Sequence, residues 1–144
     1  MKFWKSFSKR AVLKQLFFVI ALFAILIPIA IWDSDTQVKV NFGETQVTVR
    51  SDRYNMTILY DDIVTAELVQ MPDAGEKVQD GFDNDILICG VWRNDTWGEY
   101  TICADRDTAY CVVARLQDGR ILVFSQKDDE TTQELHKTLV SYLK

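Results

Sequence analysis

The spacing of apolar residues divides the chain into three kinds of segment. Residues 16–32 form one apolar run without a charged side chain, which predicts a helix that is apolar on all sides. Residues 37–125 contain short stretches in which apolar and polar positions alternate, the period of β-strands. Near the end, Leu135, Leu139 and Tyr142 follow the spacing i, i+4 and i+7, which predicts an amphipathic helix capped by Asp128 or Asp129.

The middle segment predicts a mainly β domain. Strands are expected at 37–42, 45–50, 54–60, 63–70, 85–93, 97–104, 109–117 and 120–125. The sequence Asp118-Gly119 predicts a tight hairpin turn, and the non-periodic residues 71–83 predict a long loop. We therefore expect seven or eight antiparallel strands in a sandwich or barrel, with the C-terminal helix closing one end.

The apolar run predicts a transmembrane helix over residues 11–32, because about 20 apolar residues span a bilayer. A cleaved signal peptide or a buried core helix are the alternatives. No small-residue cleavage pattern follows the run, and a domain this small rarely buries such a helix. The predicted anchor residues are Leu16, Phe17, Phe18, Ile20, Leu22, Phe23, Leu26 and Trp32.

Charges on the two sides of this run predict its orientation. Residues 1–10 form a basic arm, residues 33–36 a short linker and residues 37–144 the β domain. Basic residues flank cytoplasmic ends of membrane helices, so the N-terminus is expected in the cytoplasm and the domain outside it. The prediction is a single-pass protein of the cell membrane, oriented by Lys2, Lys5, Lys9, Arg10 and Lys14.

The formal net charge is −5, and the excess of acidic residues lies in the β domain. An acidic surface repels phosphate backbones, so binding to nucleic acid is not expected. The basic N-terminal arm serves topology in this interpretation.

Catalytic and metal-binding constellations are weak in this sequence. His136 is the single histidine, and no partner residue predicts a role as catalytic base. Residues 80–85 are rich in carboxylates, but the spacing of a calcium-binding EF-hand is absent. We therefore expect a non-enzymatic protein without a cofactor or a metal.

Three cysteines occur at positions 89, 103 and 111. Alternation places Cys103 and Cys111 on the outer face of two successive strands, where an extracytoplasmic domain permits a cross-strand disulfide; free thiols are the alternative. Cys89 is expected to pack in a central strand as a small hydrophobic residue.

Two tryptophans flank the predicted turn at Asn94-Asp95. Trp92 is expected in the core. Trp97, which precedes a glycine, is the candidate for a surface contact with a partner.

Several short motifs resemble the bacterial pleckstrin-homology-like domains. They are Tyr60-Asp61-Asp62-Ile63, Glu67-Leu68, Gly81-Phe82, Trp97-Gly98-Glu99-Tyr100-Thr101 and Asp118-Gly119-Arg120, followed by the aspartate-rich start of a last helix. The resemblance covers the whole domain and implies a small sandwich of two near-orthogonal sheets capped by a C-terminal helix, without catalytic activity. The first hairpin loop contains Glu44 and no basic residue, so phosphoinositide binding is not supported.

Two functions follow from these patterns. The first is a membrane-anchored domain that binds a protein or peptide at the membrane surface, at a sheet edge or beside the terminal helix. The alternative is a scaffolding or assembly subunit whose transmembrane helix makes the main contact with another membrane protein.

Overall fold

Two units make up the chain, Met1–Asp35 and Thr36–Lys144. The computed structural model describes residues 9–35, 37–51, 54–79, 81 and 83–143, and within residues 26–35 it describes the backbone alone. The predicted topology residues Lys2 and Lys5, and the side chains of Leu26 and Trp32, lie outside this description.

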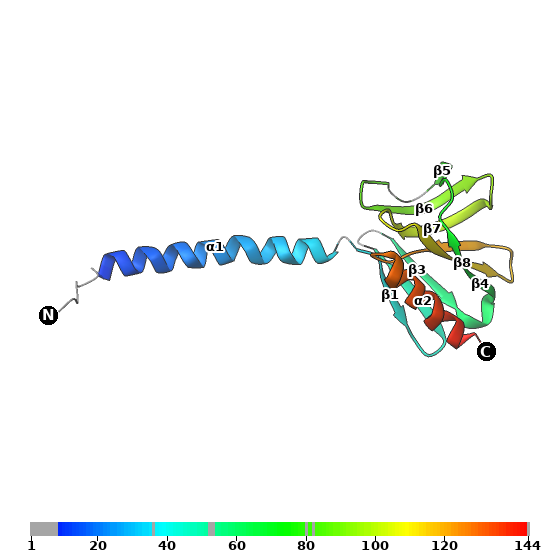
Figure 1. The fold of residues 1–144 in the computed structure, drawn as a ribbon, viewed down its shortest axis with the longest axis horizontal. Helices are drawn as coiled ribbons and strands as arrows, with labels where there is room; N and C mark the ends of the chain where they lie inside the picture. Colours follow the sequence, from blue (N-terminus) through cyan, green and yellow to red (C-terminus); the bar gives the residue numbers. More distant parts are fainter. Residues whose placement is uncertain (1–8, 36, 52–53, 80, 82, 144) are drawn as a thin grey trace. The chain divides into compact units, whose positions relative to one another are not determined.

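The first unit contains the helix α1 (Lys9–Asp35), drawn in blue and cyan in Figure 1. The helix continues into the predicted linker at 33–36, since it ends at Asp35. Its large apolar side chains between Val12 and Ile25 are exposed. Among the described residues, no helix combines the length and the apolarity required of a membrane span.

The second unit contains the strands, and most of them lie where alternation predicts. Their bounds are β1 (Lys39–Phe42), β2 (Gln46–Arg50), β3 (Asn55–Leu59), β4 (Ile63–Gln70), β5 (Glu76–Gln79), β6 (Leu87–Asn94), β7 (Gly98–Asp105), β8 (Tyr110–Leu116) and β9 (Ile121–Phe124). A 3-10 turn, η1 (Tyr60–Asp62), separates β3 from β4, and α2 (Asp129–Tyr142) closes the chain. Strand β5 lies inside the predicted loop 71–83, so that prediction is wrong for residues 76–79.

Within the described residues, the strands form two sheets, which we name by size. The small sheet has the order β1-β2-β3, and the large sheet has the order β4-β8-β9-β7-β6-β5. All strand pairs are antiparallel except β7 and β9, which run parallel. The prediction of a wholly antiparallel fold is therefore wrong for this pair, although the mainly β architecture and the terminal helix are confirmed.

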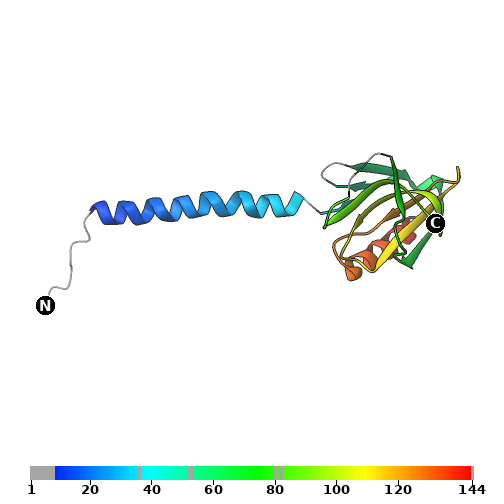
Figure 2. The ribbon, with the colours of Figure 1, turned by 90° about the horizontal axis from the view of Figure 1, so that it is seen from above.

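The main core lies between the two sheets and α2. Val47 and Val49 from β2, Ile58 from β3, Phe124 from β9 and Leu139 from α2 are all almost completely buried in it. The small sheet and α2 therefore pack on the same face of the large sheet, an arrangement that Figures 1 and 2 let the reader follow.

The opposite face of the large sheet is buried as well. Ile88, Trp92, Tyr100 and Ile102 form a second cluster there, and the segment that connects β4 to β5 packs against them through Met71 and other residues. This coverage explains why β6 is apolar on both faces. The predicted core position of Trp92 is confirmed, since its side chain is buried.

Helix α2 begins as the sequence predicts. The side chain of Asp128 accepts a hydrogen bond from the Thr131 backbone N–H at 2.7 Å, which satisfies a donor in the first helical turn.

His136 lies on the side of α2 that packs against β4, and its Nε2 donates to the Ala66 carbonyl oxygen at 3.0 Å. At the far end, the ring of Tyr142 stacks on Tyr60 with centroids 4.9 Å apart. The hydrogen bond of His136 thus joins α2 to β4, and the stacking of Tyr142 joins the end of α2 to η1.

A buried polar cluster joins the ends of β7 and β9. Ser125 Oγ accepts hydrogen bonds from the Asp105 backbone N–H at 3.0 Å and from the Thr108 hydroxyl at 2.8 Å. The Thr108 hydroxyl also lies 2.9 Å from the Asp105 carbonyl oxygen. Each buried group here has a partner, so the cluster fixes the β7–β8 loop against β9 at little cost in free energy.

Candidate functional site

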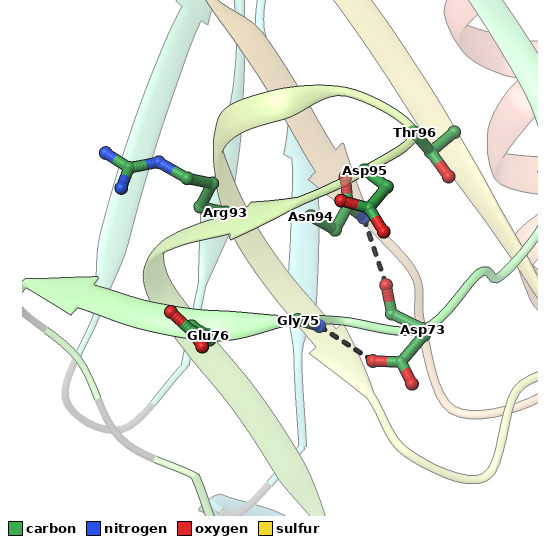
Figure 3. Close-up of a pocket in the computed structure, with 7 residues that line it drawn as sticks. All are labelled: Asp73, Gly75, Glu76, Arg93, Asn94, Asp95 and Thr96. Atoms are coloured by element: carbon green, nitrogen blue, oxygen red, sulfur yellow. Dashed lines mark hydrogen bonds between the residues drawn. The ribbon is translucent and has the colours of Figure 1, made fainter.

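The candidate site is a surface hollow where the segment before β5 meets the turn between β6 and β7. It has a volume of about 560 Å³ and is lined by Asp73, Gly75, Glu76, Arg93, Asn94, Asp95 and Thr96. Figure 3 shows these residues on two neighbouring chain segments. The site therefore lies at the edge of the large sheet that β5 forms.

A glycine shapes the first wall. Gly75 has φ of +81°, which side-chain-bearing residues rarely adopt, and a Cβ atom placed there would lie 1.9 Å from the Arg93 carbonyl oxygen. The Gly75 backbone N–H donates to Asp73 Oδ1 at 2.8 Å, closing a tight turn. The backbone at Gly75 therefore lies in close contact with β6 just before β5 begins, and only glycine fits at position 75.

The second wall is the turn between β6 and β7. Asn94 Oδ1 accepts a hydrogen bond from the Trp97 backbone N–H at 2.8 Å, and its Nδ2 donates to the Asp73 carbonyl oxygen at 3.0 Å. A single side chain thus closes the turn and ties it to the opposite wall, as the dashed line between Asn94 and Asp73 shows in Figure 3. The two walls are held at a fixed separation.

The hollow is acidic. Asp73, Glu76 and Asp95 line it, and Arg93 is the single basic residue among its lining residues. Arg93 pairs with Glu99 at 3.2 Å in an exposed salt bridge, and in Figure 3 its guanidinium points away from the Asp73 and Asp95 carboxylates. An exposed pair of this kind contributes little to stability. The carboxylates are consequently not neutralised by Arg93, and the hollow attracts cationic groups.

Two aromatic residues next to the hollow hold its walls in place: the buried Tyr100 and the half-buried Trp97. The Tyr100 hydroxyl donates to the Ala74 carbonyl oxygen at 2.6 Å, and burial raises the pKa of Tyr100 to about 12. Trp97 packs edge-on against Tyr100, with ring centroids 5.0 Å apart. Tyr100 therefore remains a hydrogen-bond donor at neutral pH and holds the segment before β5 in place.

Comparisons with known protein families, curated proteins and solved structures gave no match. The chemistry of the hollow therefore follows from its own residues, which supply backbone groups, three carboxylates, a guanidinium, an amide and a hydroxyl. Among the described residues, no cluster of histidine, cysteine, aspartate or glutamate is arranged to hold a metal ion. Asp80, which belongs to the carboxylate-rich stretch 80–85, lies outside that description.

The free edge of the large sheet adjoins the hollow. All four residues of β5 are exposed, and β5 pairs on one side with β6. In the part of the chain that the structure describes, no strand pairs with its other side. An edge strand of this kind presents backbone donors and acceptors to a further strand.

Trp97, the predicted surface contact, lies on the β6–β7 turn next to the hollow. Its side chain is half-buried against the second core cluster, so part of the ring remains accessible. Its role in binding stays a prediction. The hollow itself was missed by the sequence analysis, although Pro72, Gly75 and the Asn94-Asp95 turn marked both of its walls.

The cysteines lie differently from the prediction. Strand β9 separates β7 from β8, so Cys103 and Cys111 do not face each other across one hairpin. They lie on opposite faces of the large sheet, Cys103 in the main core and Cys111 in the second cluster, and both are free and buried. The predicted Cys103–Cys111 bridge is therefore wrong, because the two cysteines lie on strands that are not neighbours and on opposite faces of the sheet.

Cys103 instead lies directly opposite Cys89 in the β6–β7 ladder. Their sulfur atoms are 3.2 Å apart, and the Ser51 hydroxyl lies 3.6 Å from the Cys89 sulfur. The shared thiol hydrogen bond lowers the pKa of Cys89 and raises the pKa of Cys103. Burial raises the pKa of the isolated Cys111 thiol to about 12. Of the three cysteines, Cys89 and Cys103 are therefore the pair whose thiols are in contact.

Proposed function

We propose that this chain is a membrane-anchored, non-enzymatic binding protein whose β domain captures an extended segment of a protein or peptide partner along β5. The observation that carries this proposal is the exposed β5 edge, which borders an acidic hollow. The backbone of β5 supplies the hydrogen bonds of an added strand, and the hollow supplies selectivity for a side chain.

The chemistry of the hollow defines the partner segment. Asp73 and Asp95 are carboxylates on opposite walls, and the guanidinium of Arg93 points away from them. A lysine or arginine on the partner gains charge-assisted hydrogen bonds there, and these are stronger than bonds between neutral groups. The accessible part of the Trp97 ring offers an apolar contact beside the same turn. The expected ligand is therefore an extended, basic segment with an apolar residue.

The other edge of the large sheet is less suited to this role. Helix α2 packs against β4, and His136 already occupies the carbonyl oxygen of Ala66 in that strand. A segment added along β4 would have to displace this bond. Of the two modes that the sequence allowed, the sheet edge at β5 is consequently favoured over the surface beside the terminal helix.

Membrane attachment belongs to this proposal. The exposed apolar side chains of α1 between Val12 and Ile25, and the apolar run in residues 16–32, support an anchor in the cell membrane. Lys9, Arg10 and Lys14 before the run support an N-terminus in the cytoplasm and a domain outside it. Binding near a membrane then depends on the anchor for location and on the β domain for recognition.

The domain is proposed to be a variant of the pleckstrin-homology-like arrangement. Two packed sheets and a C-terminal helix support this assignment, whereas the parallel β7–β9 pair departs from the antiparallel pattern expected from the sequence. Phosphoinositide binding has no support, because the loop between β1 and β2 contains Glu44 and no basic side chain.

Selection from a random peptide display library against the purified full-length protein tests this function. We expect the selected peptides to be enriched in lysine or arginine, and their affinity to fall as ionic strength rises. Asp73→Asn combined with Asp95→Asn keeps the side-chain shapes and should weaken binding by about tenfold or more, which corresponds to about 1.4 kcal/mol. Glu134→Gln removes one exposed carboxylate from α2 and is the control for a loss of negative charge outside the hollow. Equal loss of affinity in both variants would contradict the assignment to the hollow.

The scaffolding alternative is separated by a different experiment. Residues 16–32 can be replaced by an unrelated membrane-spanning sequence in the full-length chain. A binding domain predicts that peptide binding and partner association persist after this exchange. Loss of partner association, with peptide binding intact, would favour a contact made by the anchor helix.

A further inference from the structure

The central part of the β6–β7 ladder carries a pair of thiols that no step of the proposed binding function uses. Cys89 and Cys103 are direct partners in the register of these antiparallel strands, and both side chains are fully buried in the main core. Directly opposed residues in an antiparallel ladder have Cα atoms about 4.5–5.5 Å apart, within the range of about 4.4–6.8 Å that disulfides span.

The side chains already point toward each other. The two sulfur atoms are 3.2 Å apart, so a covalent bond of about 2 Å requires small rotations of the side chains and no change of register. Cys111 has no comparable neighbour, because it lies on the opposite face of the large sheet. The fold therefore selects one pair out of the three combinations that three cysteines allow.

We propose that Cys89 and Cys103 form a disulfide that locks β6 to β7 when the domain folds under oxidising conditions. The oxidant is a small-molecule or protein disulfide that exchanges with thiols. The thiolate of one cysteine attacks the oxidant's disulfide and releases one thiol; the second cysteine then attacks the resulting mixed disulfide and releases the other. The domain loses two protons and two electrons, and the oxidant is reduced to two thiols.

Burial of both sulfur atoms determines when this reaction occurs. Because neither side chain is accessible in the folded domain, exchange takes place while the chain folds or while β6 and β7 are locally separated. The completed bridge holds together the two strands whose connecting turn forms one wall of the acidic hollow. The disulfide therefore stabilises the turn that carries Asn94 and Asp95. Formation of the bridge involves the two thiols and the oxidant alone and does not depend on partner binding.

The sequence makes the pairing easy to read by mass spectrometry. Cleavage after lysine and arginine places Cys89 in peptide 78–93, Cys103 in peptide 94–106 and Cys111 in peptide 107–115. The full-length protein is unfolded in detergent and denaturant, refolded with a mixture of reduced and oxidised glutathione, quenched in acid, alkylated after denaturation and digested. A parallel sample is oxidised while it remains denatured.

The refolded protein should yield peptide 78–93 linked to peptide 94–106, with a loss of two hydrogen atoms, and an alkylated peptide 107–115. Cys111→Ser should retain the same link, and Cys89→Ser should leave the remaining peptides unlinked. Alkylation of all three cysteines after refolding would overturn the proposal. So would a bridge that includes peptide 107–115, or a mixture of pairings equal to that of the denatured sample. The mapping of the unsubstituted chain decides the matter even if Cys89→Ser fails to fold.

Discussion

The burial of Leu139 offers a quantitative test of how α2 closes the main core. Leu139 is completely buried, whereas its neighbour Val140 is 45% exposed on the same helix. Leu139→Ala removes three carbon atoms, which corresponds to about 2.4 kcal/mol of transfer free energy at about 0.8 kcal/mol per carbon. The cavity left behind adds to this cost, so we expect a loss of about 3–4 kcal/mol in the free energy of unfolding.

The loss should be large compared with a typical total stability of about 5–15 kcal/mol. Urea unfolding of the full-length protein in detergent, followed by far-ultraviolet circular dichroism, measures it from the shift of the midpoint at constant slope. Alanine and leucine are both good helix formers, so helix propensity contributes little to the difference.

Val140→Ala is the matched control, and it should change stability by less than about 0.5 kcal/mol because the side chain is largely exposed. A Leu139→Ala effect below about 1 kcal/mol, or one equal to that of Val140→Ala, would refute the placement of α2 over the core. The two substitutions differ by one position in the helix, so they separate its two faces.

Three further substitutions test local features of the domain. Ser125→Ala leaves the buried Asp105 backbone N–H without its acceptor and removes one of the two acceptors near the Thr108 hydroxyl, so it should cost about 1–3 kcal/mol in urea unfolding, whereas the exposed Ser141→Ala should be nearly neutral. Gly75→Ala should cost more than the roughly 1–2 kcal/mol of a left-handed backbone, because its Cβ would overlap the Arg93 carbonyl; unchanged stability would contradict the turn before β5. The hydrogen bond from the first turn of α2 lowers the pKa of Asp128, so its stabilisation is present above the unfolded pKa of about 3.9 and is lost as pH falls through the lower folded pKa. Thermal melts between about pH 6 and about pH 2 should therefore show a steeper loss for the natural chain than for Asp128→Asn, and parallel curves would refute this role.

Local signals in the sequence were sufficient for most of the elements. The period of alternation located β1 to β4, β7 and β8 within a few residues, and an apolar run located β6. Asp118-Gly119 correctly predicted the β8–β9 hairpin, and Asp128 correctly predicted the start of α2. Each of these features depends on neighbouring residues and on backbone geometry alone.

Features that depend on distant packing were not predicted. Strand β5 has four exposed residues and therefore no alternation of burial; its pairing with β6 creates the strand. The parallel β7–β9 pair places β9 between two strands that are consecutive in the sequence, which periodicity cannot reveal. The same insertion separates Cys103 from Cys111, whereas the register of the β6–β7 pair places Cys103 opposite Cys89.

The candidate site shows the same division. Asp73, Gly75 and Asn94 each signal a turn in the sequence, but the hydrogen bond from Asn94 to Asp73 joins segments 21 residues apart. The composition showed that the domain is acidic. That three carboxylates gather beside the free edge of the sheet depends on the order of the strands, which composition does not reveal. Trp97 was singled out from the sequence, and it lies at the border of this hollow.

Site-specific photocrosslinking in native membranes tests binding at the β5 edge most directly. A photoreactive amino acid is placed at Val78, which is exposed on β5, and in a second protein at Glu134, which is exposed on α2. We predict a discrete adduct from position 78 that disappears when Asp73→Asn and Asp95→Asn are added, and no such adduct from position 134. An adduct from position 134 alone, or one from position 78 that persists at equal yield in the double variant, would contradict recognition of a partner at the β5 edge and its acidic hollow.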